Sequence, residues 1–159
     1  MSTTIGSVLS ERIFSALRSS DVAAHAGVAA ATWASTVTPR IFRGIAGFLG
    51  GRNRGRLPFV EFDISGIDYS HATFEGGAAT TTARIVAHAG GRDPETAGNL
   101  LEAILTAGLI AIRDESADNY TALGSDAIGP LTLGPWGHQR ETTITVVHSY
   151  GRSDYEVGQ

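Results

Sequence analysis

Hydrophobic residues near the start of the chain return every three or four positions, the period of a helix. This spacing predicts an amphipathic helix over residues 5–19, capped by a Ser or Thr among residues 2–4. The apolar stripe consists of Ile5, Leu9, Ile13, Ala16 and Leu17. Residues 21–38 are rich in alanine, and the Thr-Pro pair at 38–39 predicts a short helical piece followed by a break.

A different period, two, governs residues 57–64. Apolar side chains at 60, 62 and 64 alternate with Glu61 and Asp63, which predicts a strand with one face on the core. Paired carboxylates can perform acid–base chemistry. Alternation alone also explains their spacing, so we expect Glu61 and Asp63 on a solvated or partner-facing sheet surface.

Five more segments carry strand signals. Residues 40–43 predict a short strand, and residues 80–89 a strand that returns antiparallel to 57–64 across a polar connection at 65–79. Residues 141–150 alternate again and predict the final strand, with shorter candidates at 120–123 and 128–133.

A second helix begins at Asp93-Pro94-Glu95, with an acidic N-cap, proline at the first helical position and acid in the first turn. Its buried stripe is predicted to be Ala97, Leu100, Leu101, Ile104 and Leu105. The helix is expected to run to about Ala107, with Gly108 as its terminator. Residues 109–113 fit either a strand or a continued helix.

These elements predict one α+β domain over residues 1–159. Its sheet is mostly antiparallel and is flanked by two main helices, at about 5–19 and 94–107. Residues 152–159 are expected to form a flexible C-terminal tail.

Composition removes several function classes. The chain has no cysteine, which excludes thiol nucleophiles and zinc–thiolate sites, and no lysine, which excludes Schiff-base chemistry. Its net charge of −4 argues against a general nucleic-acid binder. No signal peptide is visible, and the apolar stretch 100–112 looks too short to span a bilayer, so no membrane partner is expected.

The five histidines form no metal-binding spacing and no HExxH motif. They are His25, His71, His88, His138 and His148. His88 and His148 stand at strand ends and could share one sheet face, so an enzyme built on them and the 61/63 carboxylates is one hypothesis. Ordinary strand histidines are the favoured interpretation, since a site needs several converging groups. We therefore predict no catalytic residue, no metal and no cofactor.

One local cluster of positive charge stands out, at Arg52, Arg54 and Arg56 in a glycine-rich loop over residues 44–56. Its glycine spacing matches no phosphate-binding motif. An Arg-Gly-Arg run can enter an A·T-rich minor groove, so a small nucleic-acid-binding module is an alternative function. The other interpretation is an arginine loop that docks on an acidic partner or lines a passage for DNA.

The order of these pieces resembles the tail-terminator (tail-completion) proteins of long-tailed, siphovirus-like phages. The family often carries an N-terminal amphipathic helix, an Arg-Ile-aromatic segment, a glycine-rich loop and a Leu-Pro-aromatic-Val strand. A partner strand, a capped helix and a last strand follow. The corresponding segments are Arg40-Ile41-Phe42, 44–56, Leu57-Pro58-Phe59-Val60, 82–89, 93–107 and 142–149.

The resemblance implies a non-enzymatic virion protein at the head-proximal end of the tail, assembled in the host cytoplasm. Copies would form a ring, usually a hexamer, that caps the tail-tube protein, ends its polymerisation and joins the head connector, with DNA only as passing cargo. Arg52, Arg54, Arg56, Glu61 and Asp63 are the predicted interface residues. A head–tail adaptor or connector subunit is the nearest alternative.

Overall fold

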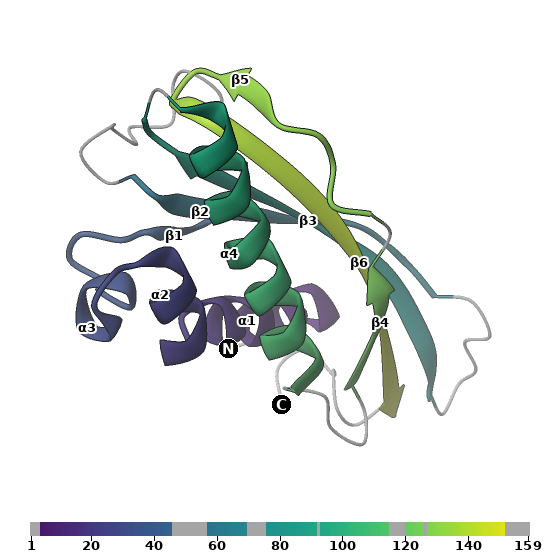
Figure 1. Ribbon diagram of the computed structural model, residues 1–159. Helices are drawn as coiled ribbons and strands as arrows, with labels where there is room; N and C mark the ends of the chain where they lie inside the picture. Colours follow the sequence, from purple (N-terminus) through teal and green to yellow (C-terminus); the bar gives the residue numbers. More distant parts are fainter. Residues whose placement is uncertain are drawn as a thin grey trace.

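The computed structural model describes residues 4–45, 57–69, 76–91, 93–114, 120–125 and 127–151. The helices are α1 (Ile5–Leu17), α2 (Ser20–Ala26), α3 (Ala30–Trp33) and α4 (Pro94–Asp114). The strands are β1 (Ile41–Arg43), β2 (Phe59–Asp68), β3 (Gly76–Ala89), β4 (Tyr120–Ser125), β5 (Thr132–Gly134) and β6 (Gly137–Gly151). Together they form a single α+β domain with one mixed sheet and a layer of helices (Figure 1).

The sheet has the strand order β1-β2-β3-β6-β4, and the short β5 also pairs with β6. Only β1 and β2 run parallel among the described strands, so the prediction of a mostly antiparallel sheet is confirmed. At its centre, β3 and β6 pair without a register shift from Gly76 opposite Gly151 to Ala89 opposite His138.

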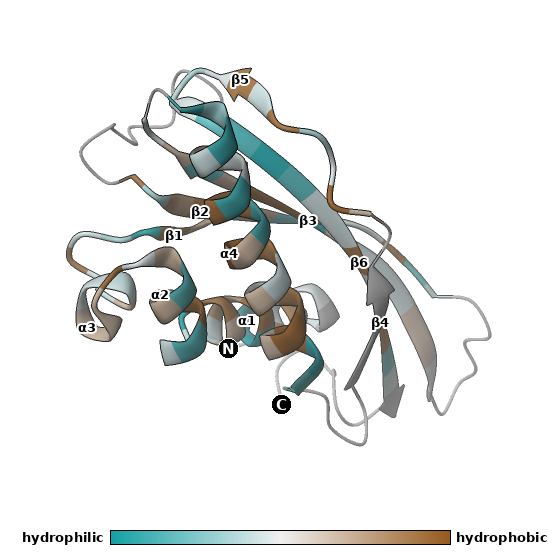
Figure 2. Ribbon diagram, in the orientation of Figure 1, coloured by the Kyte–Doolittle hydropathy of each residue, from teal (hydrophilic) through white to brown (hydrophobic). Residues whose placement is uncertain are grey.

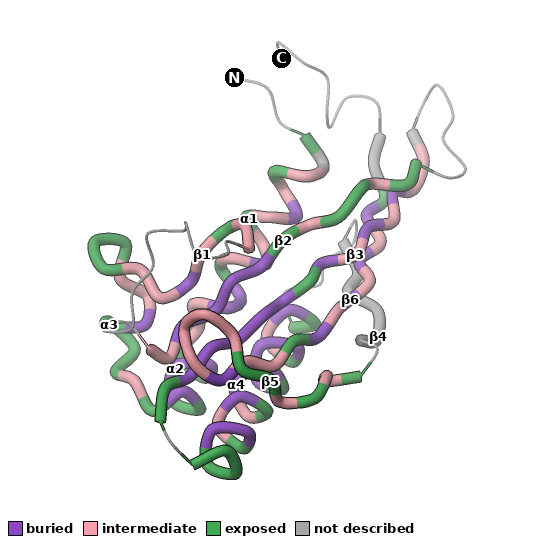
Figure 3. Tube along the Cα trace, turned by 90° about the horizontal axis from the view of Figure 1, so that it is seen from above, coloured by how far each residue is buried: buried purple, intermediate pink, exposed green. Residues whose placement is uncertain are grey.

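One face of the sheet packs against the helices and forms the core (Figures 1 and 3). Val60 and Phe62 of β2 lie on this face, as their alternation predicted. On α1 the predicted stripe is confirmed at Leu9, Ile13, Ala16 and Leu17, all buried. Figure 2 shows hydrophobic residues on α1, α4 and the central strands. Burial of these apolar side chains is the main source of stability.

Trp33 fixes the short α3 against the end of α1. Its side chain is 0% exposed, and its indole Nε1–H donates a hydrogen bond of 2.7 Å to the carbonyl oxygen of Leu17. Leu17 is the last residue of α1, so this carbonyl has no partner within the helix. One side chain therefore fills the core and satisfies a helix end.

The second predicted helix exists but is longer than expected. α4 passes through Gly108 and ends at Asp114, so the prediction that Gly108 terminates it is wrong and residues 109–113 are helical. A Cβ at Gly108 would lie 2.9 Å from Cδ2 of Leu17. The glycine is therefore explained by the close approach of α1 and α4, not by helix termination.

Of the helices described, α4 alone is long and apolar enough, by length and composition, to cross a membrane. The helix has 21 residues, so the apolar stretch 100–112, which looked too short to span a bilayer, is only part of it. Leu101, Ile104, Leu105 and Ile112 are buried in the core, which accounts for the apolar composition without a bilayer.

Asp93 caps α4 as predicted. Its carboxylate accepts hydrogen bonds from the Thr96 hydroxyl (2.5 Å) and the Glu95 backbone N–H (3.1 Å). The Thr96 bond, followed by the Glu95 bond, lowers the pKa of Asp93 from its ordinary 3.8. Because the pKa of Asp93 is lower in the folded state than in the unfolded state, the ionised carboxylate stabilises the fold at pH values above the unfolded-state pKa. This stabilisation is lost as the pH falls through the folded-state pKa.

We therefore expect Asp93→Ala to lower the thermal midpoint at pH 7 and the gap to the wild type to close below about pH 3.8. Asp93→Asn keeps a capping oxygen and is the matched control, with a smaller loss at pH 7. Thermal unfolding followed by circular dichroism from pH 7 to pH 2.5 measures both. A gap independent of pH would contradict the role of the charge.

The connection between β2 and β3 is shorter than the predicted 65–79. β2 continues to Asp68 after a register shift between Ile64 and Ile67. The Thr81 hydroxyl donates to the carbonyl oxygens of Ser65 (2.8 Å) and Gly66 (3.0 Å), which holds this irregularity in place. A bulge of this kind breaks the alternation and makes a strand look like a loop.

The remaining strand predictions are partly correct. The predicted strands at 40–43, 80–89, 120–123 and 141–150 correspond to β1, β3, β4 and β6. The candidate at 128–133 is mostly wrong, because only Thr132–Gly134 is a strand. Residues 46–56, most of the predicted glycine-rich loop over 44–56, lie outside the described residues, as does the predicted C-terminal tail over 152–159.

Candidate functional site

A small buried cluster lies on the sheet face opposite the helices. Phe59 is 0% exposed but does not belong to the main core. Its ring stacks on His88 (centroids 4.6 Å apart) and meets Phe42 edge-on at 5.5 Å and Trp136 at 6.1 Å. Side chains from β1, β2, β3 and the β5–β6 turn thus cover one end of this outer face.

Glu61 and His88 form a buried polar pair within that cluster. The His88 Nε2–H donates to Oε2 of Glu61 over 3.1 Å, and the two side chains are 3% and 0% exposed, respectively. β2 and β3 pair Phe59 with His88 and Glu61 with Val86, so the two polar side chains are diagonal neighbours on one face. A carboxylate removed from water needs such a partner.

The expectation that Glu61 lies on a solvated surface is therefore wrong, whereas Asp63 is exposed as expected. Alternation correctly separated the two faces of β2. It could not show that aromatic side chains from distant segments bury the outer face at one end. Asp63 remains a candidate interface residue, and Glu61 is enclosed within its own subunit.

His88 and His148 do not share a face. The uninterrupted register places His88 opposite Gln139 and His148 opposite Ala79. Residues opposite one another point to the same side, so His148 lies on the helix-facing side with Ala79, and His88 lies on the other. The enzyme hypothesis combined His88, His148 and the 61/63 carboxylates. The structure brings Glu61 and His88 together, but it leaves Asp63 exposed and places His148 on the other face of the sheet.

Within the described parts of the chain, no three His, Asp or Glu side chains converge closely enough to hold a metal ion. The arginines at 52, 54 and 56 lie outside the described residues, so their predicted role at an interface stays a prediction.

The middle of the outer sheet face is open and carries threonines beside the exposed ion pair of Arg84 and Glu141. On β3 and β6, Thr80 lies opposite Val147 and Thr82 opposite Thr145, and all four are partly exposed. All the buried hydrophobic residues of the four described helices except Ala97 belong to the core on the other face. We call the side chains of Thr80, Thr82, Thr145 and Val147 the threonine face.

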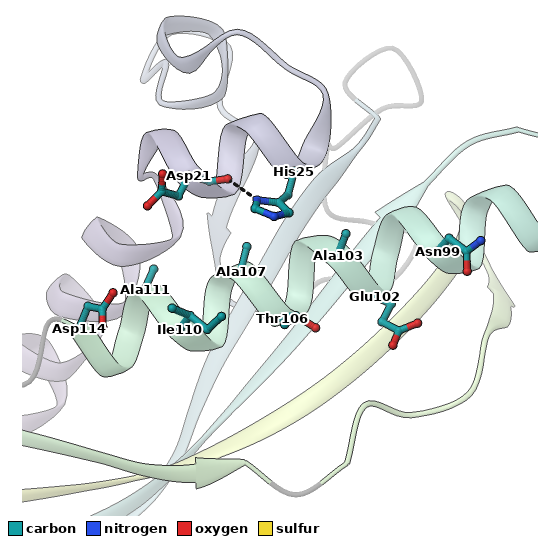
Figure 4. A pocket seen from close by; sticks show the side chains of 10 residues that line it. All are labelled: Asp21, His25, Asn99, Glu102, Ala103, Thr106, Ala107, Ile110, Ala111 and Asp114. Atoms are coloured by element: carbon teal, nitrogen blue, oxygen red, sulfur yellow. Dashed lines mark hydrogen bonds between the residues drawn. The ribbon is translucent and has the colours of Figure 1, made fainter.

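Sequence reasoning missed a groove between α2 and α4, with a volume of about 470 Å³ (Figure 4). Ala103, Ala107 and Ala111 of α4 line it, together with Asp21 and His25 of α2. Alanines four residues apart on one helix face were the available signal. Nothing in the sequence indicated that α2 would pack beside them.

No family model matches the chain, and no curated protein matches it in sequence.

Proposed function

We propose that this chain is a structural subunit that assembles into a ring, caps the tube of a phage tail, ends its polymerisation and joins the head connector. The observation that carries the proposal is the threonine face, a surface on the central strands that no described helix covers. Its small and β-branched side chains allow another backbone or side-chain layer to approach closely.

The order of elements supports the same function. The amphipathic helix, the β1–β2 unit, the capped α4 and the long final strand follow the order of the tail-terminator pattern. A rigid sheet-and-helix scaffold of this kind can position loops and a sheet face toward neighbouring subunits. Ring formation by unlike surfaces of identical copies requires no bond to be made or broken.

The proposal is tested by adding the purified protein to tail-tube protein that is polymerising. We expect rings on tube ends by electron microscopy, tubes that stop growing, and a native mass that rises from monomer to ring. Unchanged tube growth would contradict the proposal. A ring that binds the head connector but never the tube would identify a head–tail adaptor.

Substitutions on the threonine face test the surface itself. Thr82→Arg with Thr145→Arg places two adjacent cations on it, since these residues lie opposite each other. We expect at least a tenfold weaker assembly, because unpaired charge is costly to bury in an interface. Thr36→Arg, at an exposed threonine outside the sheet, is the matched control and should assemble normally.

A further inference from the structure

The groove between α2 and α4 has an apolar floor that remains open in the single chain. Ala103, Ala107 and Ala111 follow one another at four-residue spacing along the side of α4 that faces α2 (Figure 4). Ala107 is 7% exposed, and the other two are partly exposed. Ile110 borders them and is 52% exposed, which is unusual for an isoleucine. A floor of small side chains beside an exposed large one can accept an apolar side chain from outside.

The rim of the groove is acidic. Asp21, Glu102 and Asp114 all line it and are exposed. Glu102 has a partner at the edge, since Nη1 of Arg140 lies 3.7 Å from its Oε2. Asp114 is the last residue of α4, where the helix dipole is already negative, so its carboxylate is poorly placed unless a cation approaches.

We infer that this groove binds the arginine-rich segment of a second copy of the chain. In that segment Phe48 and Leu49 precede Arg52, Arg54 and Arg56 by a few residues. Two apolar side chains followed by three guanidinium groups match an apolar floor with three carboxylates at its rim. Arginine is also the cation best suited to paired contacts with carboxylates.

The two halves of this contact belong to different parts of the subunit. The groove is formed by α2 and α4, whereas the arginines lie in the chain between β1 and β2. A contact between unlike surfaces repeats head to tail and closes into a ring when the rotation allows. The inference thus rests on the proposed ring and identifies one of its interfaces.

Charge exchange between full-length chains tests the inference, with tail-tube ends present and native mass as the readout. The groove variant carries Asp21→Arg and Asp114→Arg, and the segment variant carries Arg52→Glu, Arg54→Glu and Arg56→Glu. Each alone should assemble at least tenfold more weakly than the wild type, because like charges then face each other. Asp68→Arg, at an exposed carboxylate of β2 outside the groove, is the control and should assemble normally.

Mixing the two variants in equal amounts should restore rings, since every contact in an alternating ring again joins opposite charges. A contact formed within one chain would not be restored by mixing, and that outcome would overturn the inference. Rings retained by both variants would also overturn it and leave the proposed function intact. If the wild-type protein stays monomeric in the presence of tube ends, both the inference and the proposed function are contradicted.

Circular dichroism confirms that each variant is folded. The neutral pair Asp21→Asn and Asp114→Asn provides a milder version of the groove variant, with a smaller loss of assembly. Wild-type assembly should also weaken, on the order of several-fold, when the salt concentration rises from 50 to 500 mM, because salt screens exposed ion pairs. If assembly changes neither with salt concentration nor in the Asp21→Asn, Asp114→Asn variant, the result would count against the contact.

Discussion

Replacing Glu61 by alanine is expected to lower the free energy of unfolding by about 3–5 kcal/mol. The carboxylate is fully buried, and it accepts the hydrogen bond of His88, which is itself enclosed under the Phe59 ring. Without Glu61, the Nε2–H of His88 would remain in an apolar environment with no acceptor in its place.

Urea denaturation followed by circular dichroism measures this effect. Asp63→Ala, two residues along the same strand face but exposed, is the matched control and should change stability by no more than about 0.5 kcal/mol. Replacing both partners together, Glu61→Leu with His88→Phe, should recover much of the loss because no polar group is then left buried. Equal effects of Glu61→Ala and Asp63→Ala would contradict the buried pair.

Trp33→Ala is expected to cost about 3–5 kcal/mol, since it empties a large site in the core. Trp33→Phe separates the two roles of the indole. It keeps a ring in the core but leaves the Leu17 carbonyl without its donor, at an expected cost of about 1–3 kcal/mol.

Trp136 provides the comparison for that substitution. Its Nε1–H is buried and donates to no acceptor within the described residues, and its side chain is partly exposed. Trp136→Phe should therefore cost clearly less than Trp33→Phe in the same denaturation experiment. The reverse order would show that the bond to Leu17 contributes little.

The features that could be predicted from sequence depend on local periodicity and local capping. Val60 and Phe62 reach the core because strand alternation fixes their side of the sheet. Asp93 begins α4 because its carboxylate and the following proline suit the first helical turn. Neither result required knowledge of which segments become neighbours.

The errors arose where distant segments decide the outcome. Gly108 looks like a terminator in isolation, and its place in the middle of α4 follows from the contact with Leu17. Glu61 looks solvated until its hydrogen-bond partner His88 and its neighbour Phe42 on β1 are seen beside it. The separation of His88 from His148 depends on the β3–β6 register, which no local pattern encodes.

The candidate surfaces show the same division. The alternation over residues 141–150 was visible in the sequence and predicted the strand β6. The groove could not be predicted from the sequence, because it depends on α2 lying beside the alanines of α4. Residues 109–113 were also left undecided, and this region supplies Ile110 and Ala111.

The β3–β6 ladder has a consequence for synthesis of the protein. Its paired residues lie between 49 and 75 positions apart in the chain, from Ala89 with His138 to Gly76 with Gly151. While the polypeptide leaves the ribosome, the 14-residue β3 must wait for the 15-residue β6 before that side of it is paired. A nascent chain released early would present a long unpaired strand edge, the feature that recruits other chains into aggregates. Only products translated almost to the end can complete the β3–β6 ladder.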